Sequence, residues 1–147
     1  MKRLFSNLKD RMDPSQAGRS TLRSKKEEDD FGFLELAPGE NPIVDIVAIH
    51  GLDGHRMKTW TAENGTLWLQ DLLPGELPNV RVLTYGYDAN TRSRKGVSTE
   101  TIYLHGVALL RDLSAVREDA SRRPIIFVAH SLGGIILKQA RSSLSPI

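Results

Sequence analysis

The chain has 147 residues, which is enough for one domain with a modest core, and it contains no cysteine. The lack of cysteine excludes a disulfide framework, thiol catalysis and cysteine-ligated zinc. The formal net charge of +2 conceals an uneven distribution, because residues 1–26 hold eight basic residues against two acidic ones.

The first 30 residues are predicted to form a disordered, basic and Ser-rich tail, since they carry much charge and few apolar side chains. Four apolar residues of the tail nevertheless share one helical face: Leu4, Phe5, Leu8 and Met12. The alternative is therefore a membrane-surface helix or an import presequence, with residues 1–26 in peripheral contact with a membrane. No apolar run reaches the roughly 18 residues that span a bilayer, and no secretory signal opens the chain. We therefore expect an intracellular protein.

Residues 31–147 are predicted to form one ordered domain of alternating strands and helices. The stretch 31–36 alternates apolar and other residues and predicts an edge strand, and three apolar runs predict buried strands at 43–49, 80–85 and 124–129. Helical patterns occupy the gaps at 64–73 (closed by Pro74 and Gly75), 98–119 (with Ser98 or Thr99 as N-cap) and 132–143. This alternation predicts an α/β fold, with a mainly parallel sheet in a three-layer arrangement.

Right-handed crossovers predict an order for these strands. They place strand 43–49 between 80–85 and 124–129. Strand 124–129 then lies at an exposed edge, where the chain can associate with itself. Asp45 interrupts the apolar run 43–49, and we expect it near the solvent-exposed start of that strand.

The stretch 125–134, "IIFVAHSLGG", predicts a strand, a very tight turn around Ser131 and the start of a helix. Such a turn strains the backbone at the serine, so the residues two before and two after it must be small, as Ala129 and Gly133 are. The turn lifts the Ser131 hydroxyl above the carboxyl edge of the sheet and directs the Leu132 backbone N–H, at a helix N-terminus, toward a developing oxyanion. The remaining elbow residues are His130 and Gly134.

The stretch 48–54, "AIHGLDG", follows the first buried strand, where a second oxyanion N–H is supplied in hydrolases with this kind of turn. His50 and Gly51 begin this loop, and Leu52 is the candidate backbone donor. His50 is either a buried turn histidine satisfied by backbone groups or a residue that orders the site. We expect His55, His105 and His130 to be structural or exposed.

Three stretches together closely resemble the lipase-like α/β-hydrolase domain found at the N-terminus of many fungal NACHT, ankyrin and tetratricopeptide proteins. They are "NPIVDIVAIHGLDGHRMKTWTAENGTLWLQDLLP", "VRVLTYGYDA" and "RRPIIFVAHSLGGIILKQA". The domain also resembles the serine-active-site proteins of mitochondria and endoplasmic reticulum implicated in phospholipid remodelling and, more distantly, the inositol deacylases of GPI anchors. The resemblance covers about residues 31–140 and implies Ser131 as nucleophile and Leu52 and Leu132 as oxyanion donors. It also implies lipid metabolism and a mitochondrial, reticular or membrane-associated location rather than a plain cytoplasmic one.

The sequence departs from the resemblance after the serine. In this fold the acid and the histidine of the triad follow the nucleophile along the chain, but residues 132–147 contain no His, Asp or Glu. The sequence therefore predicts the N-terminal half of an α/β-hydrolase fold, inactive by itself because a serine without a base is a poor nucleophile. A substitute pair would combine Asp53 or Asp88 with His50 or His55.

Three functions remain open at this point. The first is a serine hydrolase, a lipase or esterase, acting on a lipid or ester substrate. The second is a non-catalytic recognition or signalling module of a NACHT-type protein, and the third is a membrane-peripheral protein of lipid metabolism. No cofactor or metal site is predicted. Nucleic acid is not expected as a partner, because the chain has no basic face interleaved with aromatic residues.

Overall fold

The computed structural model describes residues 30–90 and 98–143. The elements in chain order are β1 (Gly32–Ala37), β2 (Val44–Ile49), the 3-10 helix η1 (Lys58–Trp60), α2 (Trp68–Asp71), α3 (Leu73–Glu76), β3 (Val80–Gly86), α4 (Thr99–Val116), the 3-10 helix η2 (Glu118–Ala120), β4 (Ile125–Ala129) and α5 (Leu132–Ser143). None of the described helices has the length and apolar character needed to cross a bilayer. Apart from Asp30, the tail predicted at 1–30 lies outside the described residues.

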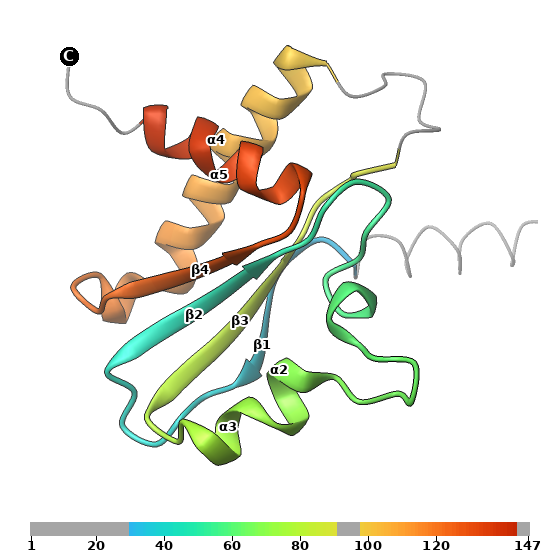
Figure 1. Ribbon diagram of the computed structural model, residues 1–147. Coiled ribbons are helices and arrows are strands. Elements are labelled where there is room, and N and C mark those ends of the chain that lie inside the picture. Colours follow the sequence, from blue (N-terminus) through green and yellow to red (C-terminus); the bar gives the residue numbers. More distant parts are fainter. Residues whose placement is uncertain (1–29, 91–97, 144–147) are drawn as a thin grey trace, which may run out of the picture.

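The four strands form one mixed sheet in the order β1-β3-β2-β4 (Figure 1). β2 pairs in parallel with both β3 and β4, whereas β1 pairs antiparallel with β3. The predicted central position of the first apolar run is therefore confirmed, and so are the two predicted edge strands. β2 and β3 are almost fully buried, as expected of apolar runs covered on both faces.

Helices cover both faces of the sheet, with α4 and α5 on one side and α2 and α3 on the other (Figure 1). Under α4 and α5, the buried core includes Val47, Leu83 and Ile136. On the opposite face, Ile46, Trp60 and Leu69 belong to a second buried cluster. The protein therefore has an α/β fold in which a mixed sheet separates two apolar cores.

Two of the three predicted helices are confirmed: 132–143 is α5, and 98–119 contains α4, which ends earlier than predicted, at Val116. The Ser98 hydroxyl accepts a hydrogen bond from the Thr101 N–H, so Ser98 is the N-cap of α4. The continuous helix predicted at 64–73 is wrong. That region begins as a turn and continues as the single-turn helices α2 and α3, and Pro74 and Gly75 lie inside α3 instead of ending a helix. Proline is compatible with the first turn of a helix, because its missing N–H would have no helical acceptor there.

The predicted exposure of Asp45 is wrong as well. Its side chain is fully buried in β2, and its two carboxylate oxygens accept hydrogen bonds of 2.8 to 3.0 Å from Arg81, Arg117 and Arg123. The guanidinium of Arg117 also donates to the backbone carbonyls of Ala120 and Arg123. A carboxylate can be buried in this way because three cations compensate the loss of water.

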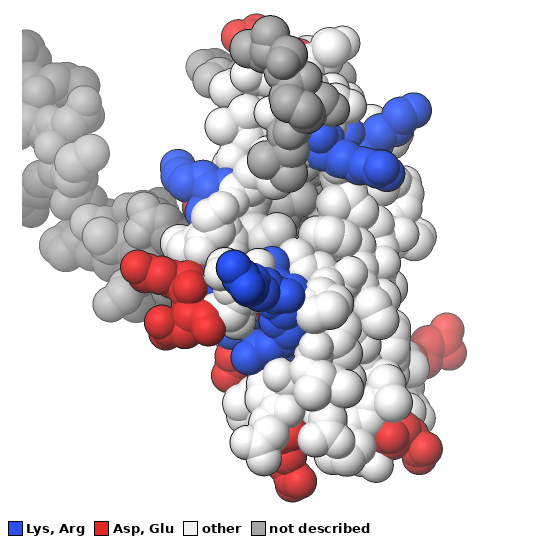
Figure 2. All heavy atoms as spheres, turned by 90° about the vertical axis from the view of Figure 1, so that its left-hand side faces the viewer, with Lys and Arg blue, Asp and Glu red and all other residues white. Residues whose placement is uncertain are grey.

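Figure 2 views the molecule from the side on which β2 and β4 begin. Lys and Arg side chains gather near the middle and in the upper part of this face, while Asp and Glu side chains lie mostly at its margins. The carboxylate of Asp45 is not part of this surface, since it is buried beneath it. The arginines that hold Asp45 thus tie the start of β2 to β3 and to the segment between α4 and β4.

The outer edge of β4 is expected to cause self-association. Within the part of the chain that the structure describes, β4 pairs only with β2, and the Ile126 side chain on it is 52% exposed. Unpaired backbone groups next to exposed apolar side chains favour strand pairing between molecules. We expect a weight-average mass that rises with concentration in analytical ultracentrifugation, and a smaller rise for Ile126→Lys. A monodisperse monomer over the whole concentration range would contradict this expectation.

Candidate functional site

Ser131 lies with His130 between the end of β4 and the start of α5, in a strained backbone conformation. Its φ of 51° falls in the left-handed region, which residues other than glycine rarely occupy. The turn is closed by hydrogen bonds from the Gly133 N–H to the His130 carbonyl and from the Gly134 N–H to the Ser131 carbonyl. Ser131 and His130 are exposed. The sharp turn predicted from the sequence is thus present, and it presents the hydroxyl at the carboxyl edge of the sheet.

Gly133 allows α5 to approach the end of β2 very closely. A Cβ atom at this position would lie 2.5 Å from the His50 carbonyl oxygen and 2.6 Å from that of Ile49. The His130 N–H also donates to the Ile49 carbonyl at 3.0 Å. The turn around Ser131 is therefore anchored on the backbone at the end of β2.

The loop at 50–54 packs directly against this turn. A Cβ atom on Gly51 would lie 2.8 Å from both the Ser131 Cβ and the His130 Nδ1. Glycine is required at this point, since any larger residue would push the loop away from the serine. The structure therefore brings the two motifs that the sequence singled out, 80 residues apart, into contact.

The two predicted oxyanion donors, the backbone N–H groups of Leu52 and Leu132, make no hydrogen bond to a carbonyl of the described residues. Leu132 is the first residue of α5, where the helix dipole favours negative charge. The Leu132 side chain is buried, whereas that of Leu52 is 43% exposed. Both predicted donors therefore lack a backbone acceptor among the described residues, and their role toward an anionic oxygen stays a prediction.

His50 is buried and its ring is satisfied by backbone groups. Its Nδ1 lies 2.9 Å from the Gly51 carbonyl and its Nε2 accepts from the Tyr87 N–H at 3.4 Å, which fixes the neutral Nδ1–H tautomer. Burial lowers the pKa of His50 below its ordinary value, which also favours the neutral ring. Of the two predictions for this residue, the buried turn histidine fits the observed contacts.

The contacts of His55 and Asp88, two members of the substitute pairs considered for the base, are made with other residues. His55 makes its ion pair with Asp30, at 3.1 Å, and its Nδ1 accepts from the Met57 and Lys58 N–H groups. One carboxylate oxygen of Asp88 accepts from the Asn90 N–H. Among the residues at 30–90 and 98–143, no histidine or carboxylate hydrogen-bonds to the Ser131 hydroxyl.

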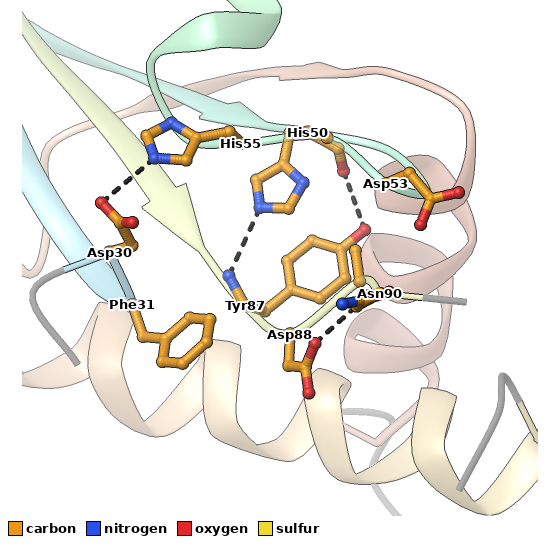
Figure 3. Close-up of a pocket in the computed structure, with 10 residues that line it drawn as sticks. Asp30, Phe31, His50, Asp53, His55, Tyr87, Asp88 and Asn90 are labelled. Atoms are coloured by element: carbon orange, nitrogen blue, oxygen red, sulfur yellow. Dashed lines mark hydrogen bonds and ion pairs between the residues drawn. The ribbon is translucent and has the colours of Figure 1, made fainter. Parts of the chain in front are cut away.

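A cavity of about 490 Å³ opens at the same edge of the sheet, beside the 50–54 loop (Figure 3). Its lining residues come from the start of β1, from this loop and from the segment after β3: Asp30, Phe31, His50, Asp53, Gly54, His55, Tyr87, Asp88, Ala89 and Asn90. Tyr87 was missed by the sequence analysis, although "YDA" (87–89) follows a buried strand at the carboxyl edge, where ligand-binding residues gather in α/β sheets. No group of three or more potential metal ligands occurs in the described part of the chain.

Comparison with known proteins gives a partial, low-identity relationship. No family model matches the chain. The chain is similar to Protein SERAC1 from Homo sapiens, with 26% identity over 141 residues, and from Danio rerio, with 25% identity over 143 residues, and each alignment covers 82% of this chain. Protein SERAC1 from Bos taurus is 28% identical over 114 residues, or 65% of this chain. The alignments cover 17% to 21% of these proteins, so the chain spans about a fifth of the length of the curated relatives it matches.

Proposed function

We propose that the chain forms the nucleophile and oxyanion part of a serine hydrolase site, in the N-terminal half of an α/β-hydrolase fold. The observation that carries this proposal is the strained turn at Ser131 packed against Gly51. Strained backbone conformations cluster at active sites, and here the strain falls on an exposed serine between a strand and a helix. The proposed roles are Ser131 as nucleophile and the Leu52 and Leu132 N–H groups as donors to the oxyanion of a tetrahedral intermediate.

The proposed substrate is a lipid ester or another carboxylic ester. Support comes from the resemblance of the motifs to lipase-like and phospholipid-remodelling proteins and from the similarity to Protein SERAC1. The general base and its acid partner are proposed to come from residues outside this sequence. A serine hydroxyl without a base retains only the contribution of the oxyanion donors and of binding.

The test uses a chimaera in which residues 31–140 replace the matching segment of human Protein SERAC1. We expect a fluorophosphonate probe to label the chimaera, Ser131→Ala to abolish the labelling, and Ser142→Ala, at an exposed serine on α5, to leave it unchanged. The 147-residue chain alone should label more slowly by about three orders of magnitude or more, the usual effect of removing a triad member. Labelling can be followed by gel fluorescence and located by mass spectrometry.

Two results would contradict the proposal. A chimaera that melts cooperatively but does not label would favour the non-catalytic recognition module. Rapid, Ser131-dependent labelling or ester hydrolysis by the 147-residue chain would show that a base is present within it, and would direct attention to His50 and His55.

A further inference from the structure

The segment that follows β3 holds the 50–54 loop on both sides of Leu52. On the N-terminal side, the Tyr87 hydroxyl donates to the His50 carbonyl at 2.9 Å, and the Tyr87 N–H donates to the His50 ring (Figure 3). On the C-terminal side, the Asp53 N–H donates to the Ala89 carbonyl at 2.9 Å. Leu52 therefore lies between two residues, His50 and Asp53, that are both hydrogen-bonded to the segment after β3.

The Tyr87 ring is itself held rigidly. It stacks on the His50 ring with centroids 4.4 Å apart and an interplanar angle of 5°, and both side chains are almost fully buried. The His105 ring packs on Tyr87 as well, with a centroid distance of 5.0 Å. Burial raises the pKa of the Tyr87 hydroxyl, so it remains a protonated donor at neutral pH.

The carbonyl that Tyr87 holds is also the one that touches the turn around the serine. A Cβ atom on Gly133 would lie 2.5 Å from the His50 oxygen, so this oxygen sits between the Tyr87 hydroxyl and the start of α5. The next peptide brings Gly51 against Ser131. A shift of the His50 carbonyl would therefore change the distance between the Leu52 N–H and the serine.

We propose that Tyr87 is a positioning residue, which fixes the Leu52 N–H for oxyanion binding through its hydrogen bond to the His50 carbonyl. The proposal rests on the proposed function. Oxyanion donors act only within a narrow range of distance, and a displacement of about 1 Å can reduce a rate by about a hundredfold. Tyr87 does not touch the reacting atoms and acts through the loop alone.

Tyr85, two residues before Tyr87 and near the end of β3, supplies a matched control. It is a buried tyrosine whose hydroxyl also donates to one acceptor, the Asp112 carboxylate at 3.3 Å. Its partner lies on α4, away from the 50–54 loop. Tyr87→Phe and Tyr85→Phe therefore each remove one buried hydroxyl and one hydrogen bond, but only the first loosens the loop.

The first measurement is amide hydrogen exchange in the 147-residue chain, read at the Asp53 amide and normalised to the Val47 and Leu83 amides of the core. For Tyr87→Phe we expect Asp53 to exchange about tenfold faster, since loss of one neutral hydrogen bond changes a local opening equilibrium by about that factor. For Tyr85→Phe we expect a change within about twofold. Unchanged exchange at Asp53 in Tyr87→Phe would overturn the proposal.

The second measurement is the kinetics of fluorophosphonate labelling in the chimaera described above. Tyr87→Phe should lower the maximal labelling rate by about ten- to a hundredfold while leaving the half-saturating probe concentration within about twofold, because only the transition state uses the oxyanion donor. Tyr85→Phe should label like the unaltered chimaera. Equal rates for the two variants would overturn the positioning role, even where Asp53 exchanges faster.

The labelling experiments distinguish an error in the proposed function from an error in the positioning role of Tyr87 alone. If the unaltered chimaera melts cooperatively but does not label, or if Ser131→Ala still labels, the proposed function is wrong and the positioning role is overturned with it. If Ser131→Ala abolishes labelling but Tyr87→Phe does not slow it, the proposed function stands and only the role of Tyr87 is wrong.

Discussion

Replacing Asp45 with Asn is expected to lower the free energy of unfolding by about 3 to 5 kcal/mol, the range found when one partner of a buried ion pair is removed. The Asp45 carboxylate is fully buried and accepts from Arg81, Arg117 and Arg123. An amide keeps the shape but removes the negative charge, so three guanidinium groups are left close together with no anion between them. Because the free energy of unfolding of a typical domain is about 5 to 15 kcal/mol, Asp45→Asn would remove a large part of it.

Glu35→Gln is the matched control for this change. Glu35 also faces Arg81, at 4.0 Å, but its side chain is 45% exposed, so its contribution should not exceed about 1 kcal/mol. Urea unfolding, followed through the fluorescence of Trp60 and Trp68, measures both variants against the unaltered chain. The interpretation is wrong if Asp45→Asn is no less stable than Glu35→Gln.

Lowering the pH should reproduce part of the loss of stability expected for Asp45→Asn, because the Asp45 carboxylate becomes protonated. Burial by itself would raise the pKa of Asp45, but the hydrogen bonds from Arg81, Arg123 and Arg117 lower it from 3.8 to about 2. This contribution is present in full above pH 3.8 and is lost as the pH falls toward 2, where the folded protein also binds the proton. The shift corresponds to about 2 kcal/mol, and this part of the pH dependence should be missing from Asp45→Asn.

The sequence predicted the elements whose signals are local. β2 and β3 are apolar runs covered on both faces, β4 is an apolar run that is only partly buried, and α4 begins at a serine whose capping hydrogen bond is made within four residues. Asp45 could not be predicted in the same way. It disturbs the apolar pattern of β2, and its arginine partners lie 36 to 78 positions away. Only the parallel pairing of β2 with β3 and β4 brings them together.

The candidate site likewise combines features with local sequence signals and contacts between residues far apart in the sequence. The turn at Ser131 follows from spacing, because the small residues that it needs, Ala129 and Gly133, lie in its own segment. The need for glycine at position 51 comes instead from contact with Ser131 and His130, about 80 residues along the chain. The contact of Tyr87 with His50 depends on β3 and β2 ending side by side, with Tyr85 opposite Ile49 in the register. The sequence around a buried tyrosine after a strand does not indicate which group its hydroxyl binds. The hydrophobic pattern gives its burial, and only the structure gives the acceptor of its hydroxyl.

Replacing Gly133 with Ala should have the second large effect, because the new methyl group would collide with backbone. The added Cβ would lie 2.5 Å from the His50 oxygen and 2.6 Å from the Ile49 oxygen, and neither can rotate away as a side chain could. Forcing a methyl group into such a contact costs about 1 to 3 kcal/mol, and we expect the upper end of this range. Either α5 or the end of β2 must then move, which separates the 50–54 loop from Ser131.

For Gly134→Ala, at the next position of the same helix, we expect the opposite change in stability. A Cβ atom there would meet no atom within 4 Å, so the change should stabilise the chain by about 0.5 to 1 kcal/mol, the usual gain for Gly to Ala within a helix. Thermal and urea unfolding of the two variants therefore move in opposite directions. In the chimaera, Gly133→Ala should lose labelling at Ser131 while Gly134→Ala keeps it, because the first displaces the turn and the second leaves it in place. Similar stabilities for the two alanine variants would mean that α5 does not begin against the end of β2, and the proposed geometry of the nucleophile would be wrong.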